Sequence, residues 1–244
     1  DWSSDVCSSD LEDPKWEDRD RFILSKGHAG IAYAPVLCDF GYNDPEQLKT
    51  FNLTNSKMGI HLDSNKVAGV DASTGSLGHG IPIAAGTAIA ARVLGKDYYT
   101  YVVTGDGELD EGSNWEGLMT IRHYNLTNCI TIVDRNHCMI DGNTEDVMKL
   151  EPLADKFVAF GFHTIVCEGN NIVSLCKAID EAHKTKDKPT VIVADTIKGV
   201  GIKLTSGNYK WHYGAIDDEM AKVAAKDLDE YSAERIARCG KEFE

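Results

Sequence analysis

The stretch from Tyr98 to Gly142 constrains the fold of this chain more than any other part of it. It opens with a β-rich run over 98–104 and breaks at Gly105-Asp106-Gly107, where two glycines flank a carboxylate and let the backbone approach a ligand closely. A helical segment and a second apolar run, Cys129 to Val133, follow. This order predicts a strand, helix, strand unit of an open sheet whose ligand binds beyond the carboxyl ends of the strands.

The helical segment inside this unit has apolar residues at helical spacing. Trp115, Leu118, Met119 and Arg122 stand at i, i+3, i+4 and i+7. We therefore expect three apolar groups and one arginine stem on a single face against the sheet.

The pattern outside the central unit predicts the same architecture. Helices are expected over 31–40, 46–52, 81–94, 147–161 and 172–184, and further strands over 162–167 and 190–196. This alternation predicts an α/β fold, with a parallel sheet and helices on both of its faces.

Two polar side chains stand at the ends of the predicted strands. Asp106 offers a carboxylate and Asn136 an amide oxygen, which suit a hard, oxygen-seeking cation such as Mg²⁺. Because Mg²⁺ takes about six oxygens, two side chains and one main-chain carbonyl leave positions for phosphate oxygens and water. The spacing favours a metal with a diphosphate over a metal alone.

Charge and cysteine usage exclude several classes of function. The formal net charge of −14, with acidic and basic residues mixed along the 244-residue chain, argues against a nucleic-acid or anionic-membrane partner. The seven cysteines form no CxxC pair and predict neither a zinc site nor a disulfide framework. With no apolar run of about 20 residues and no signal-peptide pattern, a reducing cytoplasm is the expected compartment.

The first eleven residues, DWSSDVCSSDL, differ from the rest of the chain. They lack apolar periodicity and resemble translated sequencing-adapter read-through. We expect 1–11 to be non-native and 12–244 to form a single domain whose own N-terminus is missing.

A glycine-rich loop precedes the predicted helix over 81–94. The residues 71–80 read DASTGSLGHG, and successive glycines before a helix start expose N–H groups towards an anion. No Gly-Lys-Ser/Thr follows, so this is not a Walker loop.

The central stretch resembles the signature of thiamine diphosphate enzymes: Gly-Asp-Gly and, thirty residues after Asp106, an asparagine that ends an apolar strand and precedes an Ile-Asp-Gly turn. GDGELDEG followed by DRNHCMIDG is similar to the transketolase version. This resemblance implies that Asp106, Asn136 and the main-chain oxygen of Cys138 bind Mg²⁺, and that Gly107 lies against the diphosphate of the thiamine cofactor.

Three histidines match transketolase elements that contact cofactor or substrate. His28 lies in Arg19 to Ala29, which resembles the transketolase segment with a cofactor histidine. His61 matches a sugar-binding histidine, although Ile60 and Leu62 depart from the family's Gly-His-Pro, and an exposed loop histidine without a role is the alternative. His212 matches a histidine that reaches diphosphate and substrate, with Tyr213 inserted before the glycine.

Further residues are implied by the same resemblance. Gly75, Leu77 and Gly78 match the loop that borders the diphosphate, while His79 replaces the family's usual glutamine and receives no role. Glu111, expected in the first turn of its helix, matches a glutamate of an acidic cluster between subunits. A glutamate is also favoured there by the helix dipole alone.

The resemblance implies an enzyme made of two kinds of chain. Transketolases have a second domain that binds the aminopyrimidine ring and supplies a glutamate, then a third domain, and this sequence matches neither. We expect the N-terminal subunit of a split, thiamine diphosphate- and Mg²⁺-dependent transketolase of the pentose phosphate pathway. It would transfer a two-carbon ketol unit from xylulose 5-phosphate to an aldose phosphate.

The expected partner is a C-terminal transketolase subunit that carries the pyrimidine-binding domain, in a higher oligomer of paired subunits. The alternatives are another thiamine diphosphate enzyme, such as a deoxyxylulose phosphate synthase or a keto acid dehydrogenase subunit, and a non-catalytic, cofactor-binding partner subunit.

Overall fold

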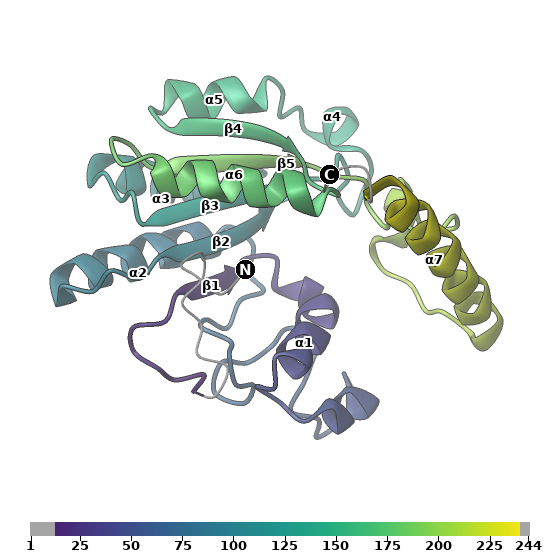
Figure 1. Cartoon of the computed structure of the whole chain (residues 1–244). Coiled ribbons are helices and arrows are strands. Elements are labelled where there is room, and N and C mark those ends of the chain that lie inside the picture. Colours follow the sequence, from purple (N-terminus) through teal and green to yellow (C-terminus); the bar gives the residue numbers. More distant parts are fainter. Residues whose placement is uncertain (1–12, 240–244) are drawn as a thin grey trace.

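The computed structural model describes residues 13–239 and contains one five-stranded, wholly parallel sheet (Figure 1). The strands are β1 (Arg21–Leu24), β2 (Thr100–Gly105), β3 (Cys129–Arg135), β4 (His163–Glu168) and β5 (Thr190–Asp195), in the order β1-β2-β3-β5-β4. The carboxyl ends of all five strands therefore lie at the same edge of the sheet. The predicted non-native segment, 1–11, lies outside the described residues.

Helices cover both faces of the sheet, which confirms the predicted fold class. The helices α2 (Gly80–Leu94), α3 (Gly112–His123) and α5 (Leu153–Ala159) share the main core with one face. The helix α6 (Ile172–Lys184) packs on the opposite face through Ala178 and Ala182. Side chains of the inner strands alternate between the two cores, so Val102 contributes to the first and Tyr101 to the second,.

Small residues bring α2 close to its neighbours. Ala84, Ala85 and Ala88 are fully or almost fully buried against the sheet. A Cβ at Gly117 of α3 would lie 2.9 Å from the main-chain nitrogen of Pro82, so the α2–α3 contact requires glycine. The alanines of 81–94 therefore serve close packing, whereas a Cβ at Gly86, the one glycine of that range, would meet nothing within 4 Å.

The remaining elements lie outside the two layers. The helix α1 (Gly30–Asp39) builds a small separate core with the segment that follows it, through Ala34, Leu37, Met58, Leu62 and Val67. The helix α7 (Asp218–Cys239) leads away from the sheet (Figure 1). Among the described helices none combines the length and the apolar character that a membrane span needs.

Four details differ from the sequence prediction. The helix expected over 46–52 is a 3-10 helix, Pro45–Thr50. Of the helix expected over 147–161 only α5 is formed; α4 (Thr144–Val147) ends where that range begins, Pro152 precedes α5, and Glu151 accepts a hydrogen bond from the Leu153 N–H at its start,. Met119 is exposed rather than on the core face. The strand β1 was not predicted as a strand.

Adjacent residues of α3 provide a test of this packing. Leu118 is 0% exposed and Met119 is 54% exposed. We expect Leu118→Ala to lower the free energy of unfolding by about 3 kcal/mol, because it leaves a cavity in the main core. The control Met119→Ala should cost less than about 1 kcal/mol. Urea denaturation measures both, and equal losses would contradict the assigned face.

Candidate active site at the carboxyl edge of the sheet

The segments that follow β1, β2, β3 and β5 meet at the carboxyl edge of the sheet. Ser25, just after β1, hydrogen-bonds Glu108 after β2. Lys26 forms an ion pair with Asp134 of β3, and Thr196, just after β5, donates a hydrogen bond to the same carboxylate. Open α/β sheets bind their ligands at this edge.

Asp106 is the most constrained carboxylate of the site. It is 1% exposed, and it accepts hydrogen bonds from the N–H groups of Gly107 at 2.8 Å and His137 at 2.7 Å. Arg135 Nη1 donates to it over 2.9 Å. Burial raises the pKa of Asp106, while Arg135 and the two N–H groups act in the opposite direction,.

The buried guanidinium of Arg135 connects this carboxylate to the next part of the chain. Besides Asp106, it donates to Thr144 Oγ1 at 2.6 Å, Glu145 Oε1 at 3.0 Å and Glu151 Oε1 at 2.9 Å. Arg135 was not among the predicted site residues, because the predicted strand ended before it. The pairing with two further carboxylates keeps the guanidinium compensated if Asp106 turns to another partner.

The three predicted metal ligands all lie at this edge. The Asn136 amide oxygen accepts from the Cys138 N–H at 3.1 Å, and no hydrogen bond within the described residues ends on the Cys138 carbonyl oxygen. Within 13–239, no group of three or more His, Cys, Asp or Glu side chains suits a metal. A set of one carboxylate, one amide and one carbonyl fits a hard cation such as Mg²⁺ rather than Zn²⁺.

The structure brings the three predicted histidines together. The rings of His28 and His212 lie 5.1 Å apart, and His61 is among the groups whose charge acts on His28. A Cβ at Gly75 would lie 2.7 Å from the His61 ring, so the glycine makes room for it. The inserted Tyr213 is 81% exposed and leaves His212 at the site.

Two lysines complete what we call the cationic cluster, which consists of Lys26, His28, His61, Lys198 and His212. Lys198 is half-buried, lies 3.3 Å from His212 Nδ1 and has no carboxylate within ion-pair distance among the described residues. Neither lysine was predicted as a site residue, although Lys26 stands in the Ser-Lys-Gly-His motif.

The mutual repulsion of these groups appears in their pKa values. Burial, and then Lys198, His28 and Lys26, lower the pKa of His212 to about 4. Burial and the same kind of neighbours lower the pKa of His28, and burial lowers that of Lys198. Burial opposes ionisation of Asp134, but Lys26 together with hydrogen bonds from Thr196 and Asn136 outweighs it and lowers the pKa of this carboxyl. A bound anion would relieve this repulsion, so the cluster fits a diphosphate.

The glycine-rich loop uses its N–H groups within the protein. Gly78 N–H donates to Glu108 Oε1 at 2.9 Å, and Gly80 N–H to Ser25 Oγ at 3.1 Å. These two N–H groups are therefore not exposed towards a bound anion as expected, because Gly78 donates to the protein's own Glu108 carboxylate and Gly80 to Ser25. The assignment of Gly75, Leu77 and Gly78 to the cofactor stays a prediction.

Two other predicted residues flank this loop. Glu111 is exposed and occupies the N-cap of α3, not its first turn. A Cβ at Gly107 would lie 3.0 Å from Met139 Cβ, so the turn after β2 packs closely on the segment after β3. Their predicted roles at the subunit interface and at the diphosphate stay predictions.

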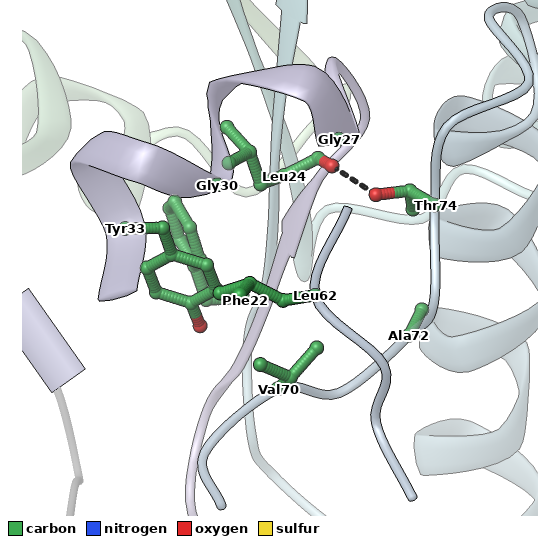
Figure 2. A pocket seen from close by; sticks show the side chains of 9 residues that line it. All are labelled: Phe22, Leu24, Gly27, Gly30, Tyr33, Leu62, Val70, Ala72 and Thr74. Atoms are coloured by element: carbon green, nitrogen blue, oxygen red, sulfur yellow. Dashed lines mark hydrogen bonds between the residues drawn. The ribbon is translucent and has the colours of Figure 1, made fainter. Parts of the chain in front are cut away.

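A small cavity lies behind the site, between β1, α1 and the glycine-rich loop (Figure 2). Its volume of about 10 Å³ is close to that of one water-sized sphere. Thr74 Oγ1 donates to the Leu24 carbonyl at 2.6 Å across it, and a Cβ at Gly27 would lie 2.5 Å from Thr74 O. The cavity marks where the glycine-rich loop docks on β1, and it is too small for a sugar.

This arrangement defines a class of protein: a parallel α/β domain that offers oxygen ligands and a cationic cluster at one sheet edge,. The profile of the family described as "Transketolase, thiamine diphosphate binding domain" matches residues 2–232. The chain belongs to the transketolase family.

Comparison with separate transketolase subunits and with longer transketolases shows which part of a transketolase this chain corresponds to. An apulose-4-phosphate transketolase subunit of Actinobacillus succinogenes is 39% identical over 91% of this chain and 80% of that protein. The 6-deoxy-6-sulfo-D-fructose transketolase subunit SqwG of Clostridium sp. is 37% identical over 92% of this chain and 82% of its own length. The transketolase structure from Leishmania mexicana aligns with a TM-score of 0.82 and 34% identity, over 96% of this chain and 40% of that one. The chain corresponds to the N-terminal subunit of a split transketolase.

The pKa of His212 leads to a prediction about pH. Between about pH 6.5 and 4 the folded ring stays neutral while an unfolded histidine binds a proton, so this group makes the wild type less stable as the pH falls through that window,. Glutamine does not titrate. We therefore expect cofactor-free His212→Gln to lose about 1 kcal/mol less stability than the wild type between pH 6.5 and 4.5, allowing for solvent screening.

Urea denaturation at a series of pH values measures this difference. His79→Gln controls for the removal of one histidine from the surface of the same region. A His212→Gln profile that runs parallel to the wild type at every pH would contradict the assigned environment of the ring.

Proposed function

We propose that this chain is the diphosphate-binding half of a thiamine diphosphate- and Mg²⁺-dependent enzyme that transfers a two-carbon ketol unit between sugar phosphates. The observation that carries the proposal is the cationic cluster beside Asp106 and Asn136 at one sheet edge. When bound, thiamine diphosphate supplies the carbanion chemistry that cleaves and forms the bond to the ketol unit.

Each group of the site has a distinct task under this proposal. Asp106, Asn136 and the Cys138 carbonyl hold Mg²⁺, which neutralises part of the diphosphate charge. Lys26 and Lys198 add positive charge on the same side. His28 and His212, whose pKa values are lowered, stay neutral near pH 7, and each neutral ring both donates and accepts a hydrogen bond at a sugar hydroxyl.

A separate chain completes the active site. The two relatives of similar length carry the word "subunit" in their names, and full-length transketolases are covered over only about a third of their length. We propose that the partner is a C-terminal subunit with the pyrimidine-binding domain, and that pairs of the two chains associate further.

The sugar substrate of this chain can differ from the usual pentose phosphates of transketolases. The relatives of similar length are named for apulose 4-phosphate and 6-deoxy-6-sulfo-D-fructose. Xylulose 5-phosphate as donor, an aldose phosphate as acceptor and a cytoplasmic role in the pentose phosphate pathway form the default proposal.

A transfer assay tests the proposal. The chain alone, and the chain mixed with the protein encoded next to it, receive Mg²⁺, thiamine diphosphate, ribose 5-phosphate and one of three donors: xylulose 5-phosphate, apulose 4-phosphate or 6-deoxy-6-sulfo-D-fructose. We expect transfer only in the mixture. Full activity of the chain alone would disprove the two-chain arrangement, and an inactive mixture with bound cofactor would disprove ketol transfer from these donors.

The variant Asp106→Asn separates a catalytic subunit from a binding scaffold. It removes a charged metal ligand, while Arg135 keeps Glu145 and Glu151 as partners. We expect the mixture to lose at least tenfold in transfer rate at limiting Mg²⁺. A scaffold would leave its partner's activity unchanged.

A further inference from the structure

Glu108 is a buried carboxylate without a cationic partner. It is 3% exposed and stands in the 3-10 turn Gly107–Asp110 after β2. No Lys, Arg or His lies within ion-pair distance of it among the described residues. A buried charge of this kind is stable only when hydrogen-bond donors surround it.

Three donors from three segments fill this role. Ser25 Oγ donates from the end of β1, Gly78 N–H from the glycine-rich loop at 2.9 Å, and Gly105 N–H from the end of β2 at 3.2 Å. Hydrogen bonds to an ionised carboxylate are roughly twice as strong as neutral ones. One side chain thus holds together three of the segments that build the site.

Ser25 extends the connection to the start of α2. Its oxygen accepts the Gly80 N–H at 3.1 Å while its hydroxyl donates to Glu108. A Cβ at Gly80 would overlap Ser25, and Gly78 has a φ of +87°, so both positions need glycine. Asn114 of α3 donates a hydrogen bond from Nδ2 to the main-chain carbonyl of Glu108 at 2.6 Å and fixes the main chain of Glu108.

We propose that Glu108 is the positioning residue of the cofactor site, which fixes the glycine-rich loop against Gly105-Asp106-Gly107 and against the segment that carries His28. This inference rests on the proposed function and deepens it. The N–H groups of Gly78 and Gly80 form hydrogen bonds within the protein. Under this proposal the loop therefore serves the cofactor by the shape of its backbone and not by these two donors.

The charge of Glu108 also decides where the anion binds. Helix N-termini attract anions, but a carboxylate already lies at the start of α2, bound to Gly78 and, through Ser25, to Gly80. A diphosphate is therefore directed away from this helix start and towards Lys198, which has no carboxylate partner among the described residues.

The isosteric variant Glu108→Gln tests the proposal on the full chain. It removes the charge and turns one acceptor into an N–H donor that faces another donor. We expect amide hydrogen exchange of 75–80 to accelerate at least tenfold while that of β3 stays within twofold of the wild type. The Kd for inorganic diphosphate with Mg²⁺, measured by calorimetry, should rise about tenfold.

Two further variants make the result decisive. Glu17→Gln removes the same charge from a side chain that is 85% exposed, and it should match the wild type in both measurements. Ser25→Ala removes the hydroxyl that donates to Glu108 and accepts from the Gly80 N–H, while Gly78 and Gly105 still donate to Glu108. It should therefore accelerate exchange in 75–82 by a smaller factor than Glu108→Gln.

The outcomes distinguish failure of the positioning role of Glu108 from failure of the proposed cofactor-binding function. The positioning role would be overturned if exchange of 75–80 were unchanged in both Glu108→Gln and Ser25→Ala. It would also be overturned if exchange accelerated equally in β3. Faster exchange confined to the loop supports that role even if the wild type binds no diphosphate, and in that case the proposed cofactor function fails. The exchange measurement involves neither cofactor nor activity.

Discussion

The buried pair of Arg135 and Asp106 joins the two strands on which the site depends. Arg135 ends β3 and Asp106 follows β2, so their contact at 2.9 Å fixes how the two strand ends approach each other. Burying a guanidinium is costly unless its donors are satisfied. Thr144, Glu145 and Glu151 satisfy the others, and thereby hold α4 and the start of α5 against the same edge.

The site gathers positively charged groups although the whole chain is acidic. The protein carries a formal charge of −14, yet the cationic cluster lies where β1, β3 and β5 end. Two of the carboxylates near it are bound outside the cluster, Asp106 to Arg135 and Glu108 to N–H and O–H donors. Asp134 pairs with Lys26 of the cluster itself, which leaves Lys198 as the lysine without a carboxylate partner among the described residues. A polyanion with its cation is the ligand that best matches a cationic cluster in an acidic protein.

The sequence predicted the elements that depend on local chemistry. Glycines beside Asp106, apolar runs of strand length and alternating helices identified β2, β3 and the parallel sheet. The histidines converged despite Ile60, Leu62 and Tyr213: His28 follows β1, its ring lies 5.1 Å from that of His212, and the His61 ring lies against Gly75.

What the sequence did not predict depends on tertiary contacts. Glu108, Lys198 and Arg135 are distinguished only by partners far along the chain, and no spacing rule connects Ser25 to Glu108. Helical periodicity placed Met119 on the core face because it does not tell how wide the buried stripe is,.

A crystal structure of the two-chain complex with thiamine diphosphate and Ca²⁺, with the cation located by anomalous scattering, tests the central claim most directly. We predict Ca²⁺ at about 2.3 to 2.6 Å from an Asp106 oxygen, the Asn136 amide oxygen and the Cys138 carbonyl, with the diphosphate between the cation and Lys198. A cation bound elsewhere, or a diphosphate at the N-terminus of α2, would contradict the account.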